Sequence, residues 1–529
     1  MTRDLSRRLQ ILTGTLFAVC SGTPALAHTP IRYDGDAIVR FDGDFSAHQS
    51  QLQAWGIESW SDHPDPFAPL LHVPASARAQ LDISGLPYEV LEPDLQAALD
   101  RASARPTKLP GAREDFFADF RPLAEIEAQL TAWAQDVPKR VAPVTVGTSL
   151  QGREIRAIRI GTHDRDREDV PIILVNATQH AREWIATSSA MYVADALIHS
   201  EDETIAALRQ EVTFVVVPVA NPDGYVFTWE EDRLWRKNRR DDVGVDLNRN
   251  WPVAWGGEGS SDDPTSNNYR GAAPLSEPEA AALAELADGL HPLVAHVDVH
   301  AYGQLVLSPW SFGLDEPPDG LELTGLGEAM ATAMSEVAGS EYTPIPAAEL
   351  YPAAGTLPDY TYGTLGARGF TFELRPMGAE PHDVGFVPGP AEIVPTGQEA
   401  LAGILTLAEA VAEARPLPPG DDGGVVVEPD TTGGSGTGDG AGSTTSGGAT
   451  SGEPPSGDGS SEDGTGVGDR DGTSDAAAAG ADAGGGACAC STRGGSPQGG
   501  WWAWAIFGGA LGRARSRRAR ARARAWARS

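Results

Sequence analysis

The sequence predicts an α/β domain over residues 113–415, built on a mixed, mostly parallel twisted sheet flanked by helices. Nearly continuous apolar runs such as "PIILVN" (171–176) and "VAHVDVH" (294–300) are typical of strands that are buried on both faces. Helical segments over 183–199 and 276–290 separate such runs, and this alternation is characteristic of an α/β domain.

The elements of this domain follow from local patterns in chain order. Apolar, β-branched runs predict strands at 154–160, 171–176, 211–221, 294–300 and 369–374. Helices are expected between them. The last helix is expected to open at Thr396, because Thr396-x-x-Glu399 is a capping-box pattern.

A smaller region, residues 28–112, precedes this domain. Strand patterns at "AIVRFDG", "LLHVP" and "PYEVLEP" alternate with the helical patterns "AHQSQLQAW", "ASARAQLDI" and "DLQAALDRA", which predicts a small open-faced α/β sandwich. It carries no candidate catalytic residue. The connection "ARPTKLPGAR" (104–113) is basic, contains proline and is expected to be exposed to proteases.

Residues 1–27 are predicted to be a signal peptide. Arginines precede a short apolar run, and "ALA" at 25–27 is a small-x-small cleavage site. The run is too short to serve as a membrane span. Lipoprotein processing at Cys20 is disfavoured because Val19 stands where a small residue is expected. We therefore expect export through the inner membrane, to the cell surface or outer membrane or into the medium.

The C-terminal part has two segments of unusual composition. Residues 416–487 are rich in Gly, Ser and Asp and are predicted to form a disordered acidic linker. Residues 488–529 carry a Cys pair (Cys488 and Cys490), a short apolar segment and an Arg-rich end. This order resembles a myxobacterial-type C-terminal sorting tag, which implies processing near the cysteines and delivery to the cell surface. A disordered basic tail with nucleic-acid affinity is the alternative.

Charge and cysteine content narrow the chemistry. A net charge of −34 over 529 residues argues against nucleic acid as a partner. The three cysteines lie near the chain ends, so residues 28–487 contain neither a disulfide nor a thiolate metal ligand. A metal site in this part must therefore use histidines and carboxylates.

One candidate for such a site is "HAREW" (180–184), where a strand gives way to a helix and His180 and Glu183 stand three positions apart. Catalytic zinc sites commonly use three such ligands and leave one position for water. The third ligand is His296 or His300, which share one face of a strand. His300 is favoured because it lies at the strand end, where ligands bind in open α/β sheets.

Hydrolysis at a metal also needs a base and a cation for the developing oxyanion. Glu373 in "FTFELR" is a lone carboxylate in an apolar strand, and its burial without a purpose would be costly. Arginines are frequent in "LWRKNRR" (234–240) and "GVDLNRNW" (244–251). An Asn-Arg pair after a strand is suited to clamping a carboxylate.

In this order, "HAREW", "NPDGY", "LWRKNR", "GVDLNRNW", "HAY" and "FTFELR" resemble the zinc metallocarboxypeptidases of the funnelin group, carboxypeptidase A/B type. The resemblance covers about residues 115–415. Residues 28–112 are more loosely similar to that family's activation propeptide. The resemblance implies a zinc carboxypeptidase-like fold, one Zn2+ per chain and release of C-terminal amino acids from peptides. The disulfide of the animal enzymes is absent.

The resemblance also implies a role for each matching residue. The implied zinc ligands are His180, Glu183 and His300, and Asp246 is the carboxylate that orients the first histidine. Glu373 is the implied general base toward the zinc-bound water, and Arg236 the implied stabiliser of the oxyanion. The implied substrate-binding residues are Asn248, Arg249 and Tyr351 at the terminal carboxylate, and Arg182 and Tyr302 beyond the scissile bond.

The pocket for the leaving residue is implied in the same way. Its matching residues are Leu307, Ser311, Leu350, Ala353, Thr356, Pro358 and Thr371. Basic-specific members of the family carry an acid at the position of Pro358, and another group carries one at that of Thr356. An uncharged pocket leaves a cationic side chain unpaired, so apolar or aromatic C-terminal residues are expected. The nearby Glu349 offers the alternative of a basic preference.

Two other functions compete with this one. The first is a zinc hydrolase of the same fold that acts on peptidoglycan stem peptides or acylated amino acids. The Asn248-Arg249 pair favours the α-carboxylate of ordinary peptides instead. The second is a non-catalytic surface binding module, whose signature would be loss of the base or of a ligand; both are present.

Residues 28–112 are expected to act as an inhibitory, folding-assisting prosegment. An unidentified activating protease would release it by cleavage near 104–114, and the alternative is a permanent accessory domain. Membrane association is expected only through the C-terminal tag, and the family's usual state is a monomer.

Overall fold

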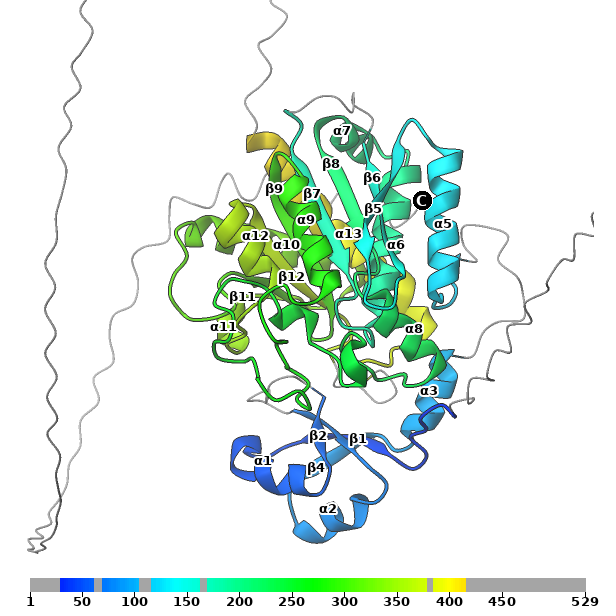
Figure 1. The fold of residues 1–529 in the computed structure, drawn as a ribbon, viewed down its shortest axis with the longest axis vertical. Coiled ribbons are helices and arrows are strands. Elements are labelled where there is room, and N and C mark those ends of the chain that lie inside the picture. Colours follow the sequence, from blue (N-terminus) through cyan, green and yellow to red (C-terminus); the bar gives the residue numbers. More distant parts are fainter. Residues whose placement is uncertain (1–28, 61–68, 104–115, 162–168, 378–383, 415–529) are drawn as a thin grey trace, which may run out of the picture. The chain divides into compact units, whose positions relative to one another are not determined.

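The computed structural model describes residues 29–60, 69–103, 116–161, 169–377 and 384–414. Within them lie a four-stranded sheet near the N-terminus and an eight-stranded sheet in the larger part of the chain (Figure 1). The predicted signal peptide, the connection at 104–113, the acidic linker and the C-terminal tag lie outside the described residues. No described helix is both long and apolar enough to cross a bilayer.

The eight-stranded sheet has the order β11-β10-β12-β9-β7-β8-β6-β5. Its centre is parallel, from β12 through β9 and β7 to β8, and antiparallel pairs flank this centre on both sides. The strands are β5 (Val141–Thr148), β6 (Glu154–Ile160), β7 (Ile172–Ala177), β8 (Thr213–Val217), β9 (Leu293–Ala301), β10 (Leu305–Ser308), β11 (Thr343–Pro346) and β12 (Arg368–Leu374).

Alternate residues of the central strands enter two separate cores, one on each face of the sheet. On β7, for example, Ile173 and Val175 enter the larger core, whereas Ile172 and Leu174 enter the smaller one. The larger core is covered by α5 (Leu123–Asp136), α6 (Trp184–His199), α7 (Glu203–Glu211), α10 (Gly320–Ala338) and α13 (Ile393–Ala414). The smaller core is covered by α9 (Pro278–Gly289) and α12 (Leu357–Leu365).

The predicted mixed, mostly parallel sheet flanked by helices is confirmed. Two local predictions are wrong. The strand expected at 211–221 ends at Val217, because Asn221 accepts a hydrogen bond from the Gly224 N–H (2.9 Å) and starts α8 (Pro222–Glu230). Thr396 does not cap the last helix, which begins at Ile393; its hydroxyl donates back to the Glu392 carbonyl (2.5 Å).

The N-terminal sheet is antiparallel, with the order β2-β3-β1-β4. Its elements are β1 (Ala37–Phe41), α1 (Phe45–Ala54), β2 (Glu58–Ser59), β3 (Leu70–Val73), α2 (Arg78–Ser84), β4 (Tyr88–Glu92) and α3 (Leu95–Ser103). One face packs on α1 and α2. The other face packs on α3 and on apolar residues of the larger part, including Leu234 and Phe386. Both faces of this small sheet are therefore covered.

Polar contacts accompany this packing between the N-terminal sheet and the larger part of the chain. The Tyr33 hydroxyl donates to Asp232 (2.6 Å), and the Ile31 N–H donates to the Glu231 carbonyl (2.7 Å). The Trp60 ring lies 5.5 Å from the Phe386 ring and is 3% exposed. The two parts therefore share an interface with an apolar centre and polar contacts.

Candidate active site

Strand pairing sets the first feature of the site. Because side chains alternate along β9, His296, Asp298 and His300 share the face that points away from the larger core. The parallel register places Glu373 of β12 directly opposite His300. A base candidate and a ligand candidate, 73 positions apart in the sequence, are thus neighbours on one face of the sheet.

The other two ligand candidates come from the turn that follows β7. Glu183 is the residue before α6, and the backbone N–H of Ala301 donates to its Oε2 (3.2 Å). The Nδ1 atom of His180 lies 2.8 Å from Glu183 Oε1, and the Nδ1 atom of His300 lies 3.0 Å from Glu183 Oε2. The three residues are buried and form the metal-binding candidate found among the described residues.

The donor set of this cluster fits a cation. Each imidazole turns its Nε2 atom toward a carboxylate, His180 to Asp246 (3.2 Å) and His300 to Asp298 (2.9 Å), so Nε2 carries the hydrogen in both rings. The two Nδ1 lone pairs then lie 3.0 Å apart and face the carboxylate of Glu183. Acceptors crowded in this way repel one another unless a cation lies among them. Two histidines and one glutamate with an open fourth position suit Zn2+.

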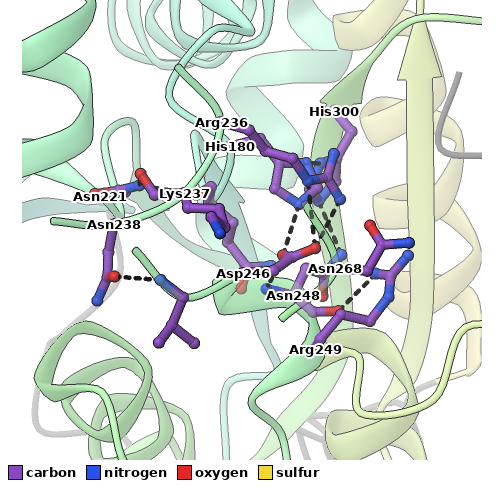
Figure 2. Close-up of polar contacts among 12 residues, drawn as sticks. His180, Asn221, Arg236, Lys237, Asn238, Asp246, Asn248, Arg249, Asn268 and His300 are labelled. Carbon is purple, nitrogen blue, oxygen red and sulfur yellow. Dashed lines mark hydrogen bonds and ion pairs between the residues drawn. The ribbon is translucent and has the colours of Figure 1, made fainter. Parts of the chain in front are cut away.

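Asp246 links the cluster to the neighbouring loop (Figure 2). Its Oδ2 accepts from Nη2 of Arg236 (2.9 Å), and its Oδ1 accepts from the backbone N–H of Asn248 (2.9 Å) as well as facing His180. The carboxylate is fully buried. Asp246 therefore orients the His180 ring and anchors Arg236 beside it.

Charges in the cluster shift the ionisation of its members. Burial would raise the pKa of Glu183, but the imidazoles of His180 and His300 outweigh it and hold that pKa below its usual range. Burial likewise opposes ionisation of Asp246, yet Arg236 and His180 hold its pKa well below normal. Both carboxylates are therefore anionic around neutral pH, as metal ligation and support require.

Arg249 is held near the cluster with part of its guanidinium unused (Figure 2). Its Nε donates to the Gly259 carbonyl (2.9 Å) and its Nη1 to the Asn248 carbonyl (2.8 Å). Its Nη2 is buried and has no hydrogen-bond partner within the described residues. A cation that is 2% exposed with an unsatisfied donor is ready to receive an anion such as a carboxylate.

These groups meet at a cavity of about 490 Å³. All three ligand candidates line it, together with Glu373, Asn248, Arg249, Tyr302 and Tyr351. So do six of the seven residues expected in the leaving-residue pocket: Leu307, Ser311, Leu350, Ala353, Thr356 and Thr371. The seventh, Pro358, is buried but is not among the lining residues.

Arg182 and Arg236 are not among the lining residues either. The Arg182 guanidinium lies over the Phe386 ring, 3.9 Å from its centroid, and the Tyr302 ring packs edge-on against the same ring at 4.9 Å. Arg182 thus supports an aromatic wall of the cavity through Phe386, which is itself a lining residue.

The structure places His296 and His300 in different surroundings. His296 lies outside the cluster, with Nε2 2.6 Å from Asn176 Oδ1 and Nδ1 2.9 Å from Thr361 Oγ1. Burial lowers the pKa of His296 to about 4, so this ring is neutral. It is a buried, hydrogen-bonded histidine of the polar layer behind the site.

Among the site residues that sequence reasoning missed are Asp298 and Trp60. Asp298 touches His300 and stands between the two weighed histidines, so the period-two pattern of the strand already placed it on the same face. Trp60 of the N-terminal region lines the cavity, and no local pattern could have shown this, because it depends on how the N-terminal sheet docks.

The amino-acid sequence is similar to those of known proteins over most of the residues that the structure describes. Residues 126–403 match the family model described as zinc carboxypeptidase. Carboxypeptidase A4 of Mus musculus is 32% identical over 395 residues, which is 72% of this chain and 92% of that protein. A relative from Ajellomyces dermatitidis, named inactive metallocarboxypeptidase ECM14, is 33% identical over 325 residues, or 56% of this chain and 54% of its own length.

A solved structure agrees with these matches. The crystal structure of thrombin activatable fibrinolysis inhibitor aligns with a TM-score of 0.67 and 26% identity, covering 72% of this chain and all of that one. The part of this chain that aligns with that structure is longer than residues 126–403, which the family model matches. The family model matches more than half of the chain, the relatives align over most of it, and a His-Glu-His cluster lies in its cavity; this chain therefore belongs to the zinc carboxypeptidase family and is a metallocarboxypeptidase.

Proposed function

We propose that the chain releases single, apolar or aromatic amino acids from the C-termini of peptides, with one Zn2+ held by His180, Glu183 and His300. The observation that carries this proposal is the shared cavity of about 490 Å³, which the ligand cluster, Glu373 and Arg249 all line. A peptide whose terminal carboxylate binds Arg249 would present its last amide bond between the ligand cluster and Glu373.

A bound zinc would act as a Lewis acid and lower the pKa of water in its open position. The chain's own residues then divide the work. Glu373 accepts a proton from the attacking water and passes it to the leaving amine when the C–N bond breaks. Arg236, which Asp246 holds beside His180 but which does not itself line the cavity, is assigned the stabilisation of the carbonyl oxygen as its negative charge grows.

Substrate binding involves the remaining cavity residues. Asn248, Arg249 and Tyr351 bind the terminal carboxylate, and Arg182 and Tyr302 act beyond the scissile bond. The unsatisfied Nη2 of Arg249 supports the first assignment. The second is supported by Phe386, which lines the cavity together with Tyr302 and contacts the Arg182 guanidinium behind it.

Preference for apolar or aromatic leaving residues follows from the walls of the cavity. Leu307, Leu350 and Ala353 contribute apolar surface, and Ser311 and Thr356 are uncharged. Glu349 also lines the cavity, but it is exposed to solvent. Solvent screens an exposed carboxylate, so its attraction for a basic residue is weak.

We also propose that residues 28–112 act as a prosegment that is released by cleavage near 104–114. Support comes from Trp60, which belongs to this region and yet lines the cavity. A substrate that extends past Phe386 would have to compete with the Trp60 ring. Export, surface delivery through residues 488–529 and a monomeric state belong to the same proposal.

The relative named inactive shows that similarity alone does not establish catalysis. A non-catalytic binding module is disfavoured here because the ligand cluster and Glu373 are present together. Hydrolysis of peptidoglycan stem peptides or acylated amino acids is the second candidate. The Asn248-Arg249 pair was expected to favour ordinary peptides, but Arg249 alone does not separate them from acylated amino acids, because both carry an α-carboxylate.

The test is hydrolysis of N-blocked dipeptides ending in Phe, Leu, Arg or Glu. The full chain is assayed before and after limited proteolysis, with and without a zinc chelator, beside Glu373→Gln. We expect chelator-sensitive release of Phe and Leu that appears on proteolysis and is lost in the variant. Release of Arg would contradict the specificity and point to Glu349, which Glu349→Gln then tests. No release by a zinc-loaded protein would favour stem peptides or a binding role.

A further inference from the structure

A second buried carboxylate, Asp298 on β9, lies behind the ligand cluster and has no part in the function proposed above. Its side chain is fully buried, and its Oδ2 lies 2.9 Å from Nε2 of His300. A buried carboxylate is costly unless hydrogen bonds compensate its lost hydration. Its partners therefore indicate what it does.

Two amide side chains hold this carboxylate in place. Nε2 of Gln179 donates to Oδ2 (2.6 Å), and Nδ2 of Asn176 donates to Oδ1 (2.7 Å). The Gln179 amide is itself oriented, because its Oε1 accepts from Nε1 of Trp251 (3.1 Å). Each oxygen of Asp298 thus accepts a hydrogen bond from a neutral amide, in addition to the contact of Oδ2 with His300.

The orientation of the Asn176 amide follows from its other neighbour. Its Oδ1 lies 2.6 Å from Nε2 of His296, and Nδ1 of that ring lies 2.9 Å from the Thr361 hydroxyl. A flipped amide would turn its oxygen toward the carboxylate of Asp298, which is acceptor against acceptor. The amide nitrogen therefore faces Asp298.

The hydrogen on His300 is placed by its carboxylate neighbour. Asp298 accepts hydrogen bonds and donates none, so Nε2 of His300 carries the hydrogen. Asn248 Nδ2 also approaches this atom, at 3.3 Å, but the carboxylate is closer and charged. With a cation among the ligands, the Nδ1 atom of His300 would present its lone pair to that cation beside Glu183, whose Oε2 lies 3.0 Å away.

We propose that Asp298 is a positioning residue that holds His300 as the Nε2–H tautomer, with Nδ1 presented to the metal. The centre would then contain two carboxylate–imidazole pairs, Asp298 with His300 and Asp246 with His180. Such outer partners orient a ligand and raise its basicity, and their loss typically costs about 10–100-fold in metal affinity. This inference rests on the metal site of the proposed function.

The test measures zinc release from the full, zinc-loaded chain into excess chromogenic chelator. Asp298→Asn keeps the shape of the side chain but removes its charge, and we expect zinc release to accelerate about 10–100-fold. The visible spectrum of the cobalt-substituted protein should also change, because a reoriented imidazole alters the ligand field. If Asp298→Asn does not fold, Asp298→Ser, which retains a neutral acceptor, takes its place and should also release zinc faster.

Thr361→Val is the matched control. It alters the far end of the same buried layer, beyond His296, while Asp298 and both amides remain. We expect its zinc release to stay within twofold of the parent, even where its melting temperature falls. Equal acceleration in both variants would reduce the role of Asp298 to general packing and overturn the inference.

The outcomes separate this inference from the proposed function. A parent chain that binds no zinc overturns the metal site itself, and the inference with it. A parent that binds zinc, with release from the Asp298 variants unchanged and an unaltered cobalt spectrum, overturns only the inference.

Discussion

Replacement of Arg249 by Met tests the carboxylate-binding assignment most directly. The Arg249 side chain is 2% exposed, and two of its nitrogens are used to hold it: Nε on the Gly259 carbonyl and Nη1 on the Asn248 carbonyl. Only Nη2 lacks a partner within the described residues. Methionine fills a similar volume without any donor, so the change removes the charge and the unused N–H while retaining much of the packing.

The size of the effect follows from these contacts. One hydrogen bond to a charged group is worth about 1.5–3 kcal/mol. At about 1.4 kcal/mol per tenfold change, kcat/KM for a peptide with a free C-terminus should fall about 10–150-fold. Loss of a fully desolvated ion pair, about 3–5 kcal/mol, sets the upper end near 4 × 10³-fold.

The assay compares an N-blocked dipeptide with its C-terminal amide. The amide lacks the anion, so Arg249→Met should reduce kcat/KM for the acid strongly and for the amide by less than threefold or so, as expected if only the ion pair is lost. Arg270→Met is the control, because Arg270 stacks on Trp255 in the same loop region and does not line the cavity. Equal losses for acid and amide, with unchanged zinc content and melting temperature, would refute the assignment.

Three further changes have defined outcomes. Glu373→Gln should lower kcat by about 10²–10⁴-fold while zinc content and melting temperature stay unchanged; a loss of zinc instead would make Glu373 part of the metal site. Burial raises the pKa of Asp359 from 3.8 to about 7. The folded state therefore retains a proton that the unfolded state loses, and the stability contributed by this group falls between pH 4 and 7, by about 4 kcal/mol. Denaturation of Asp359→Asn across this range should show no such decline; parallel curves for parent and variant would contradict the assignment. Trp60→Ala should raise the activity of the uncleaved chain and leave the cleaved chain unchanged, whereas equal effects on both forms would exclude a blocking role.

The sequence predicted the elements that depend on local pattern. The His-x-x-Glu spacing after a strand, the strand-end rule and a single carboxylate in an otherwise apolar strand led to His180, Glu183, His300 and Glu373, which the structure brings to one cavity. The capping-box pattern at Thr396 was misleading, because the helix begins at Ile393 and Thr396 lies inside its first turn.

What the sequence could not show depends on contacts between distant segments. The register that sets Glu373 opposite His300 joins two strands that are far apart in the chain, and no local pattern encodes it. The same holds for the Trp60 contact, which requires docking of a separate sheet. Pairing of Asp298 with His300 was readable from the strand period, but its amide partners on and after β7 were not.

The two faces of β9 explain how a single strand can support both stability and chemistry. Ala295, Val297 and Val299 enter the larger core, where burial of apolar area stabilises the fold. The opposite face buries His296, Asp298 and His300, whose polar atoms are hydrogen-bonded to β7, to α12 and to one another. Because these partners are protein groups, folding itself orients the ligand side chains. The conformational entropy that they lose is therefore lost on folding and not on metal binding. A metal that enters such a site meets two imidazoles whose Nε2 atoms are already anchored on carboxylates, so little of its binding energy is spent on orienting the rings.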